Sequence, residues 1–118
     1  MAHRTQLGFP RRVRITKKRE IDHVFRNATL RKTFGPIAIT GVENKLGFPR
    51  LGLAIAKRYA KKATCRNYLK RAIREWFRQN QGEFVCIDLM VSLRQRIEEP
   101  QHIHGWLSTA STCLRRRS

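Results

Sequence analysis

Apolar residues recur along the chain with two different periods, and the two periods predict different elements. A short helix is predicted over about residues 17–27, with Thr16 as its candidate N-cap. The apolar side chains that recur there at helical spacing are Ile21, Val24, Phe25 and Ala28. A last helix is predicted in the same way by Ile103, Trp106, Leu107, Ala110 and Leu114. Runs at 36–42, 51–57 and 84–93 predict strands, and the nearly continuous apolar run at 84–93 suits a central strand.

The predicted strand at 51–57 has two unlike faces. Leu51, Leu53 and Ile55 point to one side, where we expect them to enter the core. The residues between them, Gly52, Ala54 and Ala56, are small and would allow another element or a ligand backbone to come close. With room for one more short strand near 30–35, this order predicts an α+β layer fold in one domain, 1–118, with a flexible basic arm at 1–15 and a basic tail at 115–118.

The segment KRYAKKATCRNYLKRAIREWFR, residues 57–78, combines a packing pattern with strong positive charge. A helix over 64–79 gathers its apolar side chains in one arc, namely Leu69, Ala72, Ile73, Trp76 and Phe77. Beside this arc run Arg66, Lys70, Arg74 and Arg78 at i, i+4 spacing, with Asn67 and Arg71 just beyond. Like charges at this spacing destabilise an isolated helix by roughly 0.2–0.5 kcal/mol per pair. Beside phosphates the same charges become favourable, because each neutralised phosphate releases a counterion. We therefore interpret the charged side as a phosphate-binding surface.

Composition supports a polyanionic partner. The chain carries 26 Lys and Arg against 8 Asp and Glu, a net charge of +18. Nucleic acid is the first candidate for such a chain, and an acidic membrane surface is the weaker one. Three separated cysteines, no apolar run long enough to span a bilayer and no signal-peptide pattern lead us to expect a soluble intracellular protein.

The candidate chemistry of the chain itself is sparse. Its acids are scattered, and Glu98–Glu99 is the only adjacent pair, so we predict no catalytic residue and no protein-held metal. His102 and His104, with Cys113, lack the paired spacing and the fourth ligand of a zinc site. Cations near Cys65 leave two interpretations, a lowered thiol pKa or, as we favour, a plain packing role.

The stretch RLGLAIAKRYAKKATCRNYLKRAIREWFR, residues 50–78, closely resembles the signature of the protein component of bacterial ribonuclease P. That signature is a strand ending in a basic pair, a short loop and an Arg-Asn-x-x-Lys-Arg-x-x-Arg helix. FPRRVRITKKREIDHVF, residues 9–25, is similar to the first-helix region of the family, and the likeness weakens after about residue 94. The resemblance implies an α-β-β-β-α-β-α sandwich, ribosomal-protein-like, with a left-handed βαβ crossover.

The resemblance also implies a cytoplasmic ribonucleoprotein that removes the 5′ leader of precursor tRNA. Catalysis would belong to the ribonuclease P RNA, which uses Mg²⁺, with one protein per RNA. That RNA would be contacted or supported by Lys57, Arg58, Lys61, Lys62, Arg66, Asn67, Lys70, Arg71 and Arg74. The leader would lie in a cleft between the first helix and the sheet, near Phe25, Ile21, Lys17 and Lys18.

Two alternatives stay open at this point. Phe25 has a second interpretation, a core residue without ligand contact, and Ile21 stands where the family often has an aromatic residue, so that apolar packing replaces base stacking there. For the whole chain, a structural RNA-binding protein of the ribosomal type fits charge and size equally well. A DNA-binding protein fits less well, since no helix-turn-helix pattern is present.

Overall fold

The structure, a computed structural model, describes residues 11–84 and 86–115. Its main elements are α2 (Lys18–Asn27), β1 (Leu30–Phe34), β2 (Ile37–Glu43), β3 (Arg50–Ala54), α3 (Ala63–Asn80), β4 (Ile87–Leu93) and α4 (Ile103–Arg115). Three short 3₁₀ turns accompany them, η1 (Arg11–Val13), η2 (Gln81–Glu83) and η3 (Pro100–His102). This confirms the α+β class and the α-β-β-β-α-β-α order, and the extra strand expected near 30–35 is β1.

One four-stranded sheet with the order β1-β2-β4-β3 organises the chain. β2 is antiparallel to β1 and to β4, whereas β3 and β4 run parallel, with Leu51 opposite Leu89. Parallel neighbours need a long connection, and α3 provides it. The apolar run at 84–93 is therefore a central strand, as predicted, although the strand itself begins only at Ile87. The left hand of this crossover stays an expectation from the resemblance.

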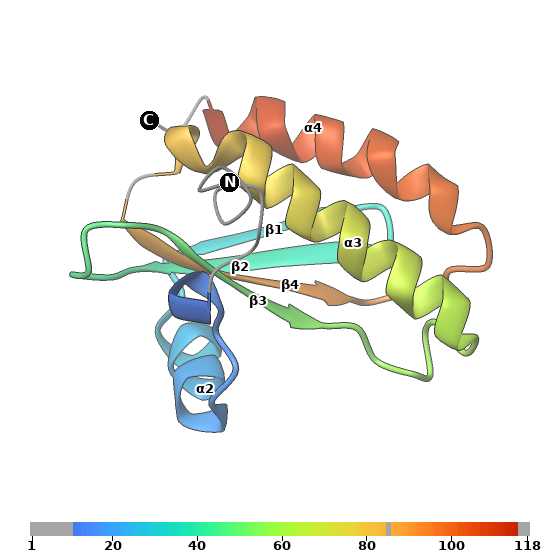
Figure 1. The fold of residues 1–118 in the computed structure, drawn as a ribbon, viewed down its shortest axis with the longest axis horizontal. Coiled ribbons are helices and arrows are strands. Elements are labelled where there is room, and N and C mark those ends of the chain that lie inside the picture. Colours follow the sequence, from blue (N-terminus) through green and yellow to red (C-terminus); the bar gives the residue numbers. More distant parts are fainter. Residues whose placement is uncertain (1–10, 85, 116–118) are drawn as a thin grey trace, which may run out of the picture.

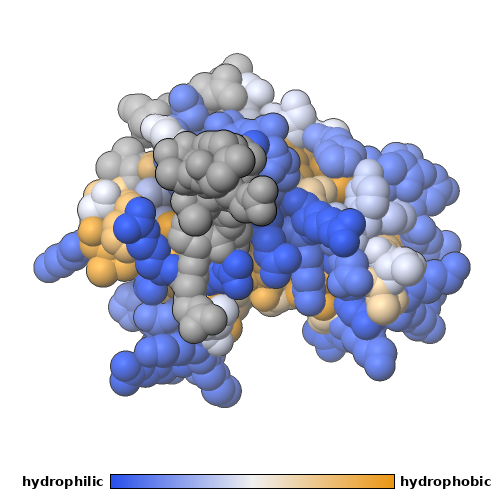
Figure 2. Space-filling model, in the orientation of Figure 1, coloured by the Kyte–Doolittle hydropathy of each residue, from blue (hydrophilic) through white to orange (hydrophobic). Residues whose placement is uncertain are grey.

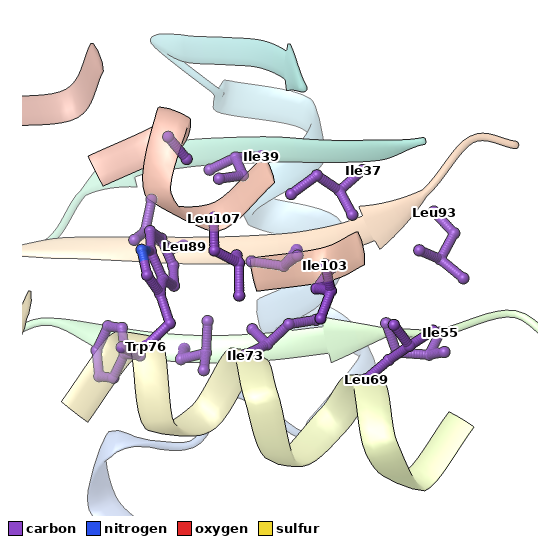
Figure 3. Packing of buried hydrophobic residues seen from close by; sticks show 14 of the residues in the cluster. Ile37, Ile39, Ile55, Leu69, Ile73, Trp76, Leu89, Leu93, Ile103 and Leu107 are labelled. Carbon is purple, nitrogen blue, oxygen red and sulfur yellow. The ribbon is translucent and has the colours of Figure 1, made fainter. Parts of the chain in front are cut away.

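Helices cover both faces of the sheet. α3 and α4 lie side by side on one face and α2 lies on the other, as Figure 1 shows. Strand alternation explains the division, because successive side chains point to opposite faces. The larger core lies under α3 and α4, where side chains of the sheet meet those of the helices (Figure 3), among them Ile37, Ile39, Leu89, Leu69, Ile73, Ile103 and Leu107.

The opposite face holds a smaller cluster formed by Ile15, Val24, Val42 and Met90. The small face of β3 lies here, as the alternation predicted. A Cβ at Gly52 would collide with the Met90 sulfur and come within 3.1 Å of the Cβ of Ile15. The element that comes close is thus the segment before α2, where the Ile15 amide donates to the Leu51 carbonyl at 2.9 Å.

Two expectations about the start of the chain need correction. Residues 11–15 are not a loose arm, because Val13 and Ile15 are buried and Arg14 forms a parallel β-bridge with Leu51 at the edge of β3. Thr16 is not the N-cap of α2, since Lys17 occupies that position without a side-chain capping bond. The predictions for residues 1–10 and 116–118 concern parts of the chain outside the described residues. No helix within the described residues is long and apolar enough to cross a membrane.

Candidate nucleic-acid interface

The two-sided character predicted for the charged helix is present in α3. Its apolar side is buried against the sheet and α4 through Cys65, Leu69, Ile73, Trp76 and Phe77. Its outer side, together with the loop before it, forms what we call the cationic surface, composed of Lys57, Arg58, Lys61, Lys62, Asn67, Lys70, Arg71 and Arg74. All of these are exposed except Lys70, which is half-buried. In Figure 2 hydrophilic residues cover the outward side of the molecule along this helix.

Charge compensation within the cationic surface is scarce. In the described part of the chain, no Asp or Glu lies within ion-pair distance of Lys70, Arg71 or Arg74. The one acid of α3, Glu75, accepts from Arg78 and Gln79 instead. The Arg78 hydrogen bond holds the pKa of the Glu75 carboxyl below its ordinary value. The helix therefore presents a net positive field to solvent, which suits a phosphate chain.

Arg66 differs from its neighbours in what it contacts. Its Nη1 donates to the carbonyl oxygens of Ala60, at 3.0 Å, and of Lys61, at 2.8 Å. The guanidinium therefore fixes the loop that carries Lys61 and Lys62 against the start of α3. Sequence reasoning grouped Arg66 with the residues that contact or support RNA, and this geometry favours the supporting role.

The residues expected at the leader lie on and beside α2. Phe25 is 38% exposed, so it is not a core residue, whereas its neighbour Val24 is fully buried. Ile21 is half-buried and packs on the smaller cluster, as expected for apolar packing. Lys17 and Lys18 are exposed at the start of α2, and Lys18 pairs with Asp22 at 3.0 Å.

The sheet beside α2 offers small side chains. Ala38, Ser92 and Ala54 are register partners across β2, β4 and β3 and are only half-buried. With Phe25 and Ile21 they form what we call the α2 face. Arg31 of β1 is exposed and donates to the Phe25 carbonyl at 2.9 Å. A cation therefore lies beside the end of α2 that carries the Phe25 ring. Sequence reasoning missed Arg31. Alternation along β1 could have found it, because Leu30 faces the larger core and the next residue, Arg31, therefore faces the side of α2.

A buried polar network fixes α2 to the sheet. Arg50 of β3 donates to both carboxylate oxygens of Asp88 in β4, at 2.9 and 2.7 Å, and to Glu20 of α2 at 3.1 Å. Asn44 donates to the same Asp88 at 2.7 Å. Asp88 raises the pKa of the Arg50 guanidinium, against the lowering effect of burial. The network holds the α2 face at a fixed position relative to the strands.

The metal and thiol alternatives find little support in the geometry. Among residues 11–84 and 86–115, no three His, Cys, Asp or Glu side chains gather where they could hold a metal ion. His102 faces Glu99 at 3.6 Å, whereas His104 bonds to Tyr68. A lowered pKa for Cys65 is wrong: burial raises the pKa of this thiol, and Arg66 and Lys62 offset that only in part. Cys65 has the packing role, as a buried residue of the larger core.

Comparison with known proteins gives consistent matches. The family model for Ribonuclease P matches residues 9–111. The ribonuclease P protein components of Proteus mirabilis and Photorhabdus laumondii are 37% and 40% identical to this chain, over 94 residues that make up 80% of it and 78% of each relative.

Solved structures show the same fold. The ribonuclease P protein of Staphylococcus aureus has a TM-score of 0.75 at 24% identity, covering 86% of this chain and 94% of that one. The protein from Thermotoga maritima has a TM-score of 0.70 at 24% identity, covering 87% and 96%. None of these matches favours a ribosomal-type structural protein. By its family match and its relatives, the chain belongs to the ribonuclease P protein family.

Proposed function

We propose that this chain binds the ribonuclease P RNA through the cationic surface of α3. As a ribonuclease P protein component it has an RNA subunit as partner and takes part in tRNA processing. The observation that carries the proposal is the division of α3 into a buried apolar side and an exposed side whose cations lack acidic partners among the described residues. Each phosphate that such a cation neutralises releases a counterion, which favours binding.

The α2 face is the surface we assign to the 5′ leader of precursor tRNA. A single strand needs ring faces for its bases and cations for its phosphates. Phe25 supplies an exposed ring, the small residues Ala38, Ala54 and Ser92 allow close approach, and Lys17 and Arg31 supply charge. Ile21 contributes apolar contact. Lys18 is less available, since Asp22 pairs with it.

Endonucleolytic cleavage itself we assign to the RNA subunit, with Mg²⁺ as its metal. The side chains of this protein do not fit Mg²⁺, because the described acids are separated or already engaged, as Asp88 and Glu20 are with Arg50. The protein's part is to bind and position both RNAs. We place the complex in the cytoplasm and expect one protein per RNA.

Reconstitution tests this proposal. Precursor tRNA cleavage by the ribonuclease P RNA is measured at low Mg²⁺ with and without the full chain. We expect the protein to raise the cleavage rate, and we expect no cleavage by the protein alone. A rate that does not change on adding protein would count for a purely structural role, and cleavage by a nuclease-free protein preparation would contradict the assignment of chemistry to the RNA.

A further inference from the structure

A groove between α3 and α4 opens beside the cationic surface, and the function proposed above assigns no occupant to it. It has a volume of about 520 Å³, within the roughly 300–1,000 Å³ range of ligand sites. None of the residues that line it is an acid: they are Thr64, Asn67, Tyr68, Arg71, Ala72 and His104. Two of these residues, Asn67 and Arg71, belong to the cationic surface, so the groove is continuous with it.

Tyr68 is the unusual member of this groove. It is a large aromatic residue in the second turn of a charged helix, yet it is 39% exposed. Its hydroxyl lies 2.9 Å from Nε2 of His104, and the two rings meet edge to face at 5.7 Å. The ring is thus fixed from α4 rather than from the core. An aromatic ring that is exposed and already oriented can stack on a base without first losing conformational freedom.

The charges around the groove select its occupant. Arg71 and the exposed Arg74 lie on the outer side, where a sugar-phosphate chain would run. The amide of Asn67 can both donate to and accept from a base edge. Farther along the same two helices a second groove shares Ala72 and His104 but is lined by Glu75. That acid disfavours phosphate there, which places an RNA contact at the Tyr68 end.

We propose that this groove holds one unpaired base of the ribonuclease P RNA, stacked on Tyr68, read at its edge by Asn67 and flanked by a phosphate on Arg71. The inference rests on the proposed function, since it assumes that α3 meets this RNA. It adds a base contact to a phosphate contact, and it brings α4, through His104, into the interface.

Variants of the full chain separate stacking from charge. Affinity for the ribonuclease P RNA is measured by filter binding over a range of salt concentrations for Tyr68→Leu, Tyr68→Phe and Leu46→Ala, an exposed apolar control on the β2–β3 loop. We expect Tyr68→Leu to raise Kd about 5- to 150-fold, the equivalent of one lost base stack, with the salt slope unchanged. Tyr68→Phe keeps the ring and should stay within a few fold of the unsubstituted chain, as should Leu46→Ala.

Chemical probing of the RNA bases supplies the second readout. We expect at least one unpaired base to be protected by the unsubstituted chain and by Tyr68→Phe and to be reactive with Tyr68→Leu. Equal affinity of Tyr68→Leu would overturn the inference while leaving the proposed function intact. A loss seen only with leader-bearing tRNA would assign the base to the leader and overturn it too.

Failure of the proposed function looks different. In that case the unsubstituted chain itself would not bind the ribonuclease P RNA, and the inference would fail with it. Urea unfolding of each variant checks that the fold is intact. Should Tyr68→Leu not fold, His104→Ala gives the second test, because it removes from α4 the whole imidazole that the Tyr68 ring meets edge to face, a ring contact that Tyr68→Phe keeps. It should raise Kd and weaken the same base protection, and unchanged binding would contradict the proposal.

Discussion

Arg50 donates to both carboxylate oxygens of Asp88, at 2.9 and 2.7 Å, from the neighbouring parallel strand. Both side chains are largely buried, with 15% and 6% exposed. Replacing Arg50 by Met leaves the Asp88 carboxylate without its charge partner. We expect the free energy of unfolding to fall by about 3 kcal/mol, toward the low end for a broken buried pair.

Urea unfolding measures this loss. The double variant Arg50→Met with Asp88→Leu should recover a large part of it, since no unpaired charge then remains. Glu20→Gln, a change at the half-buried third member of the network, should cost less than either single change at the pair. A double variant as unstable as Arg50→Met alone would show that the unpaired Asp88 carboxylate is not the cause of the lost stability.

Arg71→Ala with Arg74→Ala tests the cationic surface. Both side chains are exposed, so the fold should be unaffected. We expect weaker binding of the ribonuclease P RNA and a salt slope smaller by roughly 1.4–1.8, at about 0.7–0.9 per lost phosphate contact. Lys45→Ala, an exposed cation on the β2–β3 loop, is the control. An unchanged slope in the double variant would mean that the two arginines do not touch phosphates.

Arg66→Ala should behave differently from Arg71→Ala. Because Arg66 donates to the carbonyls of Ala60 and Lys61, its loss releases the loop before α3 as well as any RNA contact. We expect a fall in thermal stability for Arg66→Ala and none for Arg71→Ala, measured by circular dichroism without RNA. Equal melting temperatures for the two variants would contradict the supporting role assigned to Arg66.

Phe25→Ala tests the α2 face. The ring is 38% exposed, so stability should change little, whereas affinity for leader-bearing over mature tRNA should fall about 5- to 150-fold in the reconstituted complex. Val24→Ala is the matched comparison, since Val24 is fully buried and its truncation should lower stability instead. If affinity for the two tRNAs falls equally, Phe25 does not contact the leader.

Gly52→Ala tests the close approach at β3. The added Cβ would meet the Met90 sulfur and lie 3.1 Å from both the Cβ and the carbonyl oxygen of Ile15. We expect destabilisation of about 1–3 kcal/mol, the usual effect of overpacking. Gly82→Ala, where the new Cβ meets open space, should show no such loss. Met90→Ala should lower stability less in the Gly52→Ala background than in the unsubstituted chain, since it also removes the sulfur that the new Cβ meets.

Cys65 gives a prediction of reactivity. Burial raises the pKa of its thiol, so the folded chain holds this proton to higher pH than the unfolded chain does. At pH 8 we expect Cys65 to be alkylated by iodoacetamide more slowly than the half-buried Cys113, as read by peptide mass spectrometry. The protonated thiol therefore contributes stability below the pKa that it has in the unfolded chain. This contribution is lost as the pH rises through the higher pKa of the folded chain. Faster modification of Cys65 would contradict the burial argument.

Periodicity was enough to predict what lies within one element. The buried side of α3 and the two faces of β3 follow from spacing alone, because one repeat length fixes which side chains share a side. Contacts between distant segments were not predictable in this way. Arg50 and Asp88 are 38 positions apart, and the acid lies inside an apolar run that gives no sign of a partner.

Cys65 shows the same limit in electrostatics. The sequence displays the cations beside it, whereas the burial that outweighs them depends on the packing of α3. Tyr68 likewise reads as one residue of a charged helix until α4 brings His104 to its hydroxyl. The features that the sequence did not predict are therefore those that depend on how two separate elements pack against each other.

The strand order β1-β2-β4-β3 has a consequence for how the protein is made. The two strands flanking β4 are synthesised before it, yet they do not pair with each other and must wait for it to insert between them. Since chains emerge amino end first, α3 and its cationic surface leave the ribosome before β4, the central strand of the sheet on which α3 packs. Ribosome-bound intermediates of this protein would thus be exposed to premature contact with the RNA around them.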